Sequence, residues 1–193
     1  MPKQQGRAPS SLPEDRWLPA RLIPTSGIKG VDEQEKRATS ALLSVMMAVP
    51  EFSRALLRKV EARAGSLKAY IEPPFTTTTG KMRPDGALVV RRGANVWRAF
   101  VEVKTGTNEL NREQIEGYLD LARDENFNAV ITISNQLTTA VDSHPLTVDR
   151  RKTKKVGLYH WSWVEILSEA VLQREFRGVS DQDQAWILGE LIA

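Results

Sequence analysis

The amino-acid sequence predicts a mixed α/β fold (α+β), in which helices flank one sheet of parallel and antiparallel strands. Three strand-like segments follow an N-terminal helical region, and the last two are joined by a connection short enough to require an antiparallel hairpin. A further helix then leads to another buried strand, which is typical of a parallel crossover. The order of helix, three strands, helix and strand therefore excludes a purely parallel sheet.

Composition and charge narrow the class of protein. The chain has 193 residues, of which 41% are hydrophobic and 26% charged, as in ordinary globular domains. It has no apolar run long enough to cross a membrane, no secretory signal at its polar N-terminus and no cysteine. We therefore expect a cytoplasmic protein without membrane association. The net charge of +3 permits a nucleic-acid partner without requiring one.

We expect two parts along the chain: an arm or linker over residues 1–30 and one globular domain over 31–193. The apolar residues around Trp17 are expected to pack against the domain as an extended segment. The core of the domain is expected over about 32–134, with a strand and helices following within 156–193. The last helix lacks a terminating glycine or proline, which leaves open that the chain is a piece of a longer protein.

Two helices are expected before the first strand. Apolar residues recur at helical spacing from Ala38 to Val49, with Asp32 as a candidate N-cap and Glu35 three residues later. This helix is expected to stop at Pro50, and a second one to cover 51–64.

Three strands are expected over 68–75, 85–92 and 97–104, with a turn that contains Gly93 between the last two. The threonine run 76–79 is expected to be a loop. The remaining elements are expected in the order helix 110–125, strand 128–134, strand 156–161, helix 163–173 and helix 181–192.

Acidic and basic residues meet on the predicted hairpin. Glu102 and Lys104 alternate with Val103 along a strand, so their side chains project from one face while the valine points to the other. The hairpin folds Asp85, at the start of the neighbouring strand, toward Glu102. Pro84 cannot donate a ladder hydrogen bond, which suits the end of an edge strand.

These residue types suit phosphodiester chemistry. Two carboxylates can hold Mg²⁺ or Mn²⁺, which lowers the pKa of a bound water and neutralises charge on a scissile phosphate. Lys104 would orient or help deprotonate that water, or stabilise transition-state charge. Gln114 and Tyr118 lie one turn apart on the following helix. Gln114 is expected to reach the phosphate or Lys104, and Tyr118 to brace it or contact a nucleic-acid backbone.

Three motifs occur in a fixed order along the chain: Pro84-Asp85, Glu102-Val103-Lys104 and Gln114-x-x-x-Tyr118. Their order and spacing resemble the PD-(D/E)XK nuclease superfamily, and specifically its RecB-like branch, over about residues 32–134. The resemblance implies a restriction-endonuclease-like core and hydrolysis of nucleic acid, with DNA as the expected substrate and Mg²⁺ or Mn²⁺ as the cofactor.

The same resemblance implies roles for individual residues. The implied catalytic residues are Asp85, Glu102, Lys104 and Gln114. The implied metal-binding residues are Asp85, Glu102, Val103 and Glu35. Glu35 extends the buried stripe of the first helix, and for this residue capping that helix and binding metal both stay open.

A looser likeness extends further along the chain. The run 101–136, the pair His144-Pro145, the triplet Trp161-Ser162-Trp163 and the segment 183–192 resemble a poorly characterised actinobacterial stress-response family. Members of that family are longer than this chain. The likeness says little about a substrate.

Other charged or titratable residues have weaker signals. The basic run 150–155 is either a solvated surface or a phosphate-contacting loop, with Arg150, Arg151 and Lys152 as the expected nucleic-acid contacts alongside Tyr118. His144 and His160 are too few and too isolated in the sequence for a zinc site, and are expected in loop or packing roles.

Three alternatives to an active nuclease stay open. The acidic and basic residues could form only a solvated cross-strand ion pair. The fold could serve as a catalytically silent module that binds nucleic acid or protein. The domain could also need a partner or a C-terminal region before it cuts. The sequence does not distinguish single from double strands, and a homodimer stays open.

Overall fold

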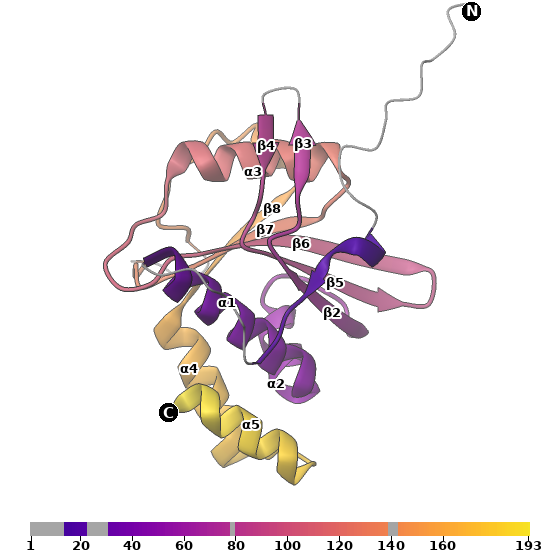
Figure 1. Cartoon of the computed structure of the whole chain (residues 1–193), viewed down its shortest axis with the longest axis vertical. Helices are drawn as coiled ribbons and strands as arrows, with labels where there is room; N and C mark the ends of the chain where they lie inside the picture. The colour runs from indigo at the N-terminus through magenta and orange to yellow at the C-terminus, as the bar shows by residue number, and fades with distance from the viewer. Residues whose placement is uncertain (1–13, 23–30, 78–79, 139–142) are drawn as a thin grey trace, which may run out of the picture.

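The computed structural model describes residues 14–22, 31–77, 80–138 and 143–193, without the side chains of residues 31 and 32. Six strands form one sheet in the order β1-β2-β5-β6-β7-β8, and helices cover both of its faces (Figure 1). Neighbouring strands are antiparallel from β1 to β6 and parallel from β6 to β8. This arrangement confirms the predicted mixed α/β fold.

Two helices precede the central strands, as expected. Helix α1 covers Val31–Ala48 and α2 covers Pro50–Arg58, with the proline in the first turn of α2, where its missing N–H costs nothing. Helix α2 is shorter than expected, because the backbone turns away after it and Glu61 adopts a left-handed φ of 61°. Helix α1 begins at Val31, and the side chain of the expected N-cap Asp32 lies outside the described residues.

The predicted hairpin is present. Strands β5 (Gly86–Arg92) and β6 (Asn95–Val103) are antiparallel, and Gly93 in their turn has a φ of 58°, which glycine adopts without strain. Strand β2 (Ser66–Ile71) pairs with the other edge of β5. Strand β5 is therefore an interior strand, and the expectation that Pro84 marks an edge is wrong. The proline precedes the strand, where no ladder hydrogen bond is lost.

The threonine run is not a loop throughout. Strand β3 (Phe75–Thr77) and strand β4 (Gly80–Met82) form a separate antiparallel hairpin, with Thr76 opposite Lys81. The strand expected over 68–75 instead ends at Ile71, because a left-handed Glu72 and two prolines follow it. β-branched threonines then favour a new strand.

Helix α3 (Arg112–Asp124) connects β6 to the parallel strand β7 (Ala129–Ser134), as the sequence predicts. It begins at Asn111, whose side chain accepts a hydrogen bond from the Gln114 N–H and caps the helix. Strand β8 (Gly157–Ser162) then pairs in parallel with β7 at the edge of the sheet. Figure 1 shows α3 and the β3–β4 hairpin on one face, with α1, α2, α4 and α5 on the other.

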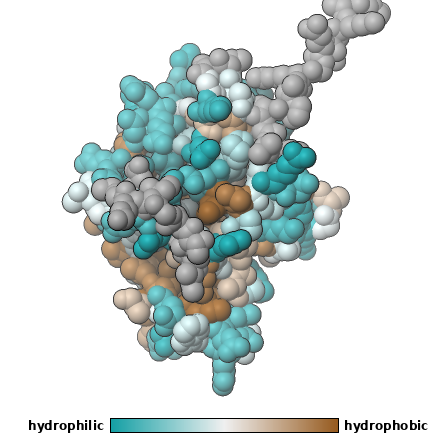
Figure 2. Space-filling model, viewed as in Figure 1, coloured by the Kyte–Doolittle hydropathy of each residue, from teal (hydrophilic) through white to brown (hydrophobic). Residues whose placement is uncertain are grey.

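The C-terminal segment is helical. Helix α4 (Trp163–Val171) continues into a π-helical turn (η3, Leu172–Arg177), and α5 (Gln182–Ile192) follows. Apolar side chains remain on the outside of this part, including Phe176 at 78% exposed and Trp186 at 63%. Figure 2 shows apolar surface over the end of the molecule that holds these helices.

The described part of the N-terminal arm packs on the domain. A short 3-10 turn (η1, Glu14–Arg16) leads to strand β1 (Leu18–Pro19), which pairs with β2. Trp17 is buried against Tyr70 and Phe75, in agreement with the expected extended segment.

The sheet separates two apolar cores. One lies under α1, α2, α4 and α5 and includes Val101 and Val103, and the other lies under α3 and includes Phe100, whose ring stacks on Phe127. Side chains alternate along β6, so Glu102 projects on the α3 side, with Phe100.

No single helix in the described ranges is long and apolar enough to cross a membrane. The consecutive helices Glu33–Ala48 and Pro50–Arg58 are together long and apolar enough by length and composition, and the pair is bent by 108° where they meet.

Candidate active site

The acidic residues meet where β6 ends. Gly86 lies opposite Val101 in the antiparallel register, so the residue before Gly86 falls beside the residues after Val101. Asp85 Oδ2 accepts a hydrogen bond from the Val103 main-chain N–H at 2.8 Å. This bond fixes the Asp85 carboxyl group against the strand that carries Glu102. The structure thus brings together the pair that the hairpin predicts.

Glu102 is the buried member of the pair, with 1% of its surface exposed. Lys104, Asp85 and Tyr118 lie close to this carboxylate and act to lower its pKa, but among the described residues none forms a hydrogen bond of good geometry with it. Its close charged partner is the Lys104 ammonium, 3.0 Å from Oε1 as an ion pair. Burial raises the pKa of Glu102 despite this cation. The attraction of this one ammonium does not offset the cost of burying the carboxylate.

The pKa of the neighbouring Asp85 is raised as well. Burial, followed by repulsion from Glu102, raises the pKa of Asp85 to about 8, although the Val103 N–H and Lys104 act in the opposite direction. Two carboxyl groups that resist ionising together are the environment that a hard divalent cation would relieve. The donor set of Asp85 and Glu102 therefore fits Mg²⁺ or Mn²⁺, which use one or two carboxylates with water and phosphate oxygens.

Lys104 lies between two acids from different elements. Its Nζ is 3.0 Å from Glu102 Oε1 and 3.3 Å from Glu35 Oε2. Burial by itself would lower the pKa of Lys104, but Glu102, Asp85 and Glu35 outweigh it and the net pKa is raised. Lys104 is therefore a stable ammonium at neutral pH, which suits orienting a water or stabilising negative charge better than accepting a proton.

Glu35 reaches this end of the sheet from α1. It is 8% exposed, in agreement with its place on the buried stripe of the helix. Its Oε1 accepts hydrogen bonds from Asn108 Nδ2 at 2.7 Å and the Thr105 N–H at 3.4 Å. No sequence signal singled out Asn108, because its role depends on a partner far away in the chain.

The described residues contain no group of three or more His, Cys, Asp or Glu side chains placed to share one metal ion. Glu35 is already bound to Lys104, Thr105 and Asn108, so it stands apart from the Asp85–Glu102 pair. A metal-binding role for Glu35 stays a prediction.

Helix α3 brings Gln114 and Tyr118 to the same region. Gln114 Nε2 donates to the Tyr118 hydroxyl at 3.1 Å, and that hydroxyl donates to the Arg83 carbonyl oxygen at 3.2 Å. Tyr118 is only 4% exposed, which fits the bracing role better than contact with a nucleic-acid backbone. Burial and the nearby Glu102 raise the pKa of Tyr118, so it stays a neutral donor.

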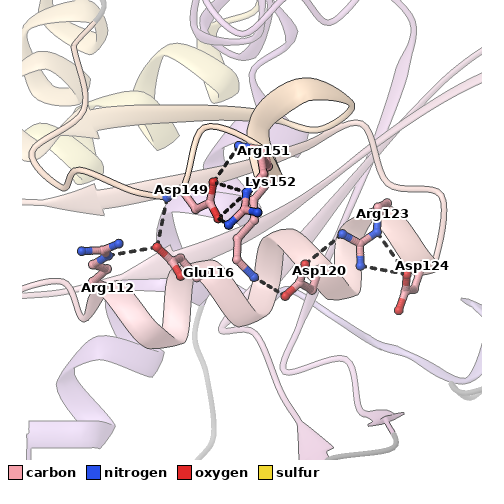
Figure 3. Close-up of polar contacts among 8 residues, drawn as sticks. All are labelled: Arg112, Glu116, Asp120, Arg123, Asp124, Asp149, Arg151 and Lys152. Carbon is pink, nitrogen blue, oxygen red and sulfur yellow. Dashed lines mark hydrogen bonds and ion pairs between the residues drawn. The ribbon is translucent and has the colours of Figure 1, made fainter.

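The basic loop lies elsewhere. Figure 3 shows Arg151 bound to Asp149, and Lys152 bound to Asp120 on α3. The loop precedes Gly157, where β8 begins, and β8 runs parallel to β7 and β6, so the loop lies at the end of the sheet opposite Lys104. The structure therefore does not bring Arg150, Arg151 and Lys152 to the carboxylates. Their contact with nucleic acid stays a prediction.

The two histidines meet, although the sequence shows them as isolated. Thr132 Oγ1 lies 2.8 Å from His144 Nε2 and 2.9 Å from His160 Nδ1, and the rings are 5.7 Å apart. Burial lowers the pKa of His144 to about 4 and lowers that of His160 as well. Both imidazoles are therefore neutral at pH 7, and both residues are half-buried.

Comparisons with known proteins do not assign a family. No protein-family model matches this sequence, and no curated protein matches it. Among solved structures, the chain is similar to a crystal structure described as a protein of unknown function, AF1548, with 10% identity and a TM-score of 0.35. That similarity covers 75% of this chain and 96% of the other.

Proposed function

We propose that this protein is a metal-dependent nuclease that hydrolyses phosphodiester bonds of nucleic acid, with DNA as the expected substrate. The observation that carries the proposal is the pair of carboxyl groups at the end of β6: Glu102 is 1% exposed, and burial and repulsion from Glu102 raise the pKa of its neighbour Asp85 to about 8. A solvated surface ion pair would leave these groups exposed, and it would not raise the pKa of Asp85 to about 8.

Each residue of the site has a role in this proposal. Asp85 and Glu102 would hold Mg²⁺ or Mn²⁺, with Val103 contributing through its main chain. A cation held there would supply an activated water and neutralise charge on the phosphate. Lys104 keeps its ammonium positive through its acidic neighbours, and so can stabilise negative charge on the phosphate oxygens. Gln114, held by Tyr118, orients the substrate from α3.

The test combines cleavage with metal binding. We expect the wild-type chain to cut linear, circular or branched DNA in Mg²⁺ or Mn²⁺, and Asp85→Asn and Lys104→Ala each to reduce the rate about 100-fold or more. Calorimetric titration should show Mn²⁺ binding that Asp85→Asn abolishes. The matched control is Asp149→Asn, since this aspartate lies in the distant basic loop, paired with Arg151.

The outcomes separate the alternatives. Cleavage that survives in Asp85→Asn, or a wild-type chain that binds no Mn²⁺, contradicts the proposed site. If the protein binds Mn²⁺ but cleaves no DNA or RNA, the proposed hydrolase activity is wrong and the alternative of a catalytically silent binding module is favoured. A C-terminally extended chain that gains cleavage would show that the domain needs a further region.

A further inference from the structure

Three adjoining hollows line the end of the sheet that lies away from the carboxylates. Their volumes are about 640, 280 and 370 Å³. The first and second share Arg63, and the second and third share Glu61, Trp97 and Asn128. The hairpin end of β5 and β6 and the start of β8 border this surface, whereas Asp85 and Lys104 lie at the opposite ends of those strands. We call it the distal basic groove.

Six exposed cations line the distal basic groove: Arg54, Arg58, Arg63, Arg92, Lys154 and Lys155. None of them forms a salt bridge with a carboxylate in the described ranges, whereas Arg151, Lys152 and Arg177 nearby are paired. The acidic side chains lining the groove are Glu51 and Glu61. The Glu51 carboxylate already accepts a hydrogen bond from the Ser180 hydroxyl.

The cations come from separate parts of the chain. Arg54 and Arg58 lie one turn apart on α2, Arg92 ends β5, and Lys154 and Lys155 precede β8. Six cations and two acidic residues, Glu51 and Glu61, leave this surface with a net positive charge, which a polyanion would neutralise. A hollow with the half-buried Trp97 beside these cations also offers an aromatic surface to a base.

We propose that the distal basic groove binds the phosphate backbone of nucleic acid without reading its sequence. This inference goes beyond the proposed hydrolysis, because binding here needs neither the metal ion nor Asp85, Glu102 and Lys104. It also moves the expected phosphate contacts of the basic run from the paired Arg151 and Lys152 to Lys154 and Lys155, which form no salt bridge with any residue that the structure describes. Each phosphate neutralised releases condensed counterions, so affinity should fall with salt.

The experiment measures nucleic-acid binding under conditions that prevent cleavage. Fluorescence anisotropy of a labelled oligonucleotide is recorded in EDTA over a range of salt concentrations, with Asp85→Asn present in every protein. In that background, the double variant Arg63→Glu with Lys155→Glu is compared with Arg16→Glu with Lys81→Glu. The control changes net charge equally, and its two residues are also exposed but lie outside the groove.

We expect the groove variant to raise Kd about tenfold or more and to lower the slope of log K against log salt by about 1 for each phosphate that the protein no longer neutralises. The neutral variant Arg63→Gln with Lys155→Gln should move both quantities in the same direction, and circular dichroism verifies folding.

Equal weakening by the control pair, or a groove variant that binds like the parent, overturns the proposal. Binding through the groove without any cleavage would contradict only the proposed hydrolase activity. Cleavage together with a Kd that the groove substitutions leave unchanged would contradict only this inference.

Discussion

At the scale of single residues, burial decides the chemistry. Glu102 and Lys104 are ordinary charged residues by type, and on an exposed strand they would contribute a few tenths of a kcal/mol as an ion pair. Glu102 is 1% exposed and shares its surroundings with Asp85. Its charge therefore acts through a medium that screens poorly, and each neighbour shifts the protonation of the others.

This coupling predicts an unusual pH dependence in the metal-free protein. The folded pKa of Asp85 is raised to about 8 from an ordinary value of 3.8, so between these values the folded state keeps a proton that the unfolded chain releases. Stability from this group is complete below the unfolded pKa and is lost as pH rises through the folded one. Asparagine at this position keeps an acceptor for the Val103 N–H and carries no titrating charge.

We therefore compare the free energy of unfolding of Asp85→Asn with that of wild type at pH 5 and at pH 8, both in EDTA. The difference should shift in favour of Asp85→Asn by roughly 1–3 kcal/mol from pH 5 to pH 8, because one proton changes stability by up to about 1.4 kcal/mol per pH unit. Urea unfolding at the two pH values measures this difference. A constant difference between the two proteins would show that Asp85 does not titrate in this range.

At the scale of elements, the start of α3 sets the position of Gln114. The Asn111 side chain accepts the Gln114 N–H at 2.9 Å, and the next turn places Tyr118 under the Gln114 amide. The cap, the glutamine and the tyrosine thus form one local unit. Their spacing is visible in the sequence, because the i, i+3 and i+4 relations of a helix are local.

Asn111→Ala should lower the free energy of unfolding by about 1 kcal/mol, because the first turn of α3 loses its cap. We also expect a lower cleavage rate under conditions where the variant is fully folded, since the Gln114 main chain is less restrained. Asn111→Ser is the matched control, because serine also caps helices. Urea unfolding and cleavage assays should show serine close to wild type, and an equally weak serine variant would contradict the capping explanation.

At the scale of the whole molecule, the site depends on both layers that cover the sheet. Glu35 comes from α1 on one face, and Gln114 and Tyr118 come from α3 on the other. Glu35 contacts Lys104 directly beyond the end of β6, and Tyr118 lies near Glu102 on the same strand. Packing of α1 on the sheet should therefore affect the site as well as the stability.

Leu43 is fully buried between α1 and the sheet, and its Cδ1 would lie 2.7 Å from a Cβ added at Gly86. Leu43→Ala should cost about 2–5 kcal/mol in chemical unfolding. Leu137→Ala is the control, because Leu137 is 73% exposed and should change stability by less than about 0.5 kcal/mol. A small effect at Leu43 would mean that α1 does not depend on this contact.

Local patterns in the sequence were enough for most of the fold. The hairpin around Gly93, helix α3 and the buried β7 follow from turn chemistry and periodicity, which act over a few residues. The β3–β4 hairpin and the interior place of β5 did not follow, because strand pairing depends on partners elsewhere in the chain.

The sequence by itself determined which residues form the candidate site, because Asp85, Glu102, Lys104, Gln114 and Tyr118 stand at spacings that strands and helices convert into proximity. Only the tertiary structure decided that Glu102 is buried beside Asp85, that Asn108 holds Glu35, and that exposed cations from separate elements gather at the distal basic groove. Burial and charge pairing arise from residues far apart in the chain, so no local pattern encodes them.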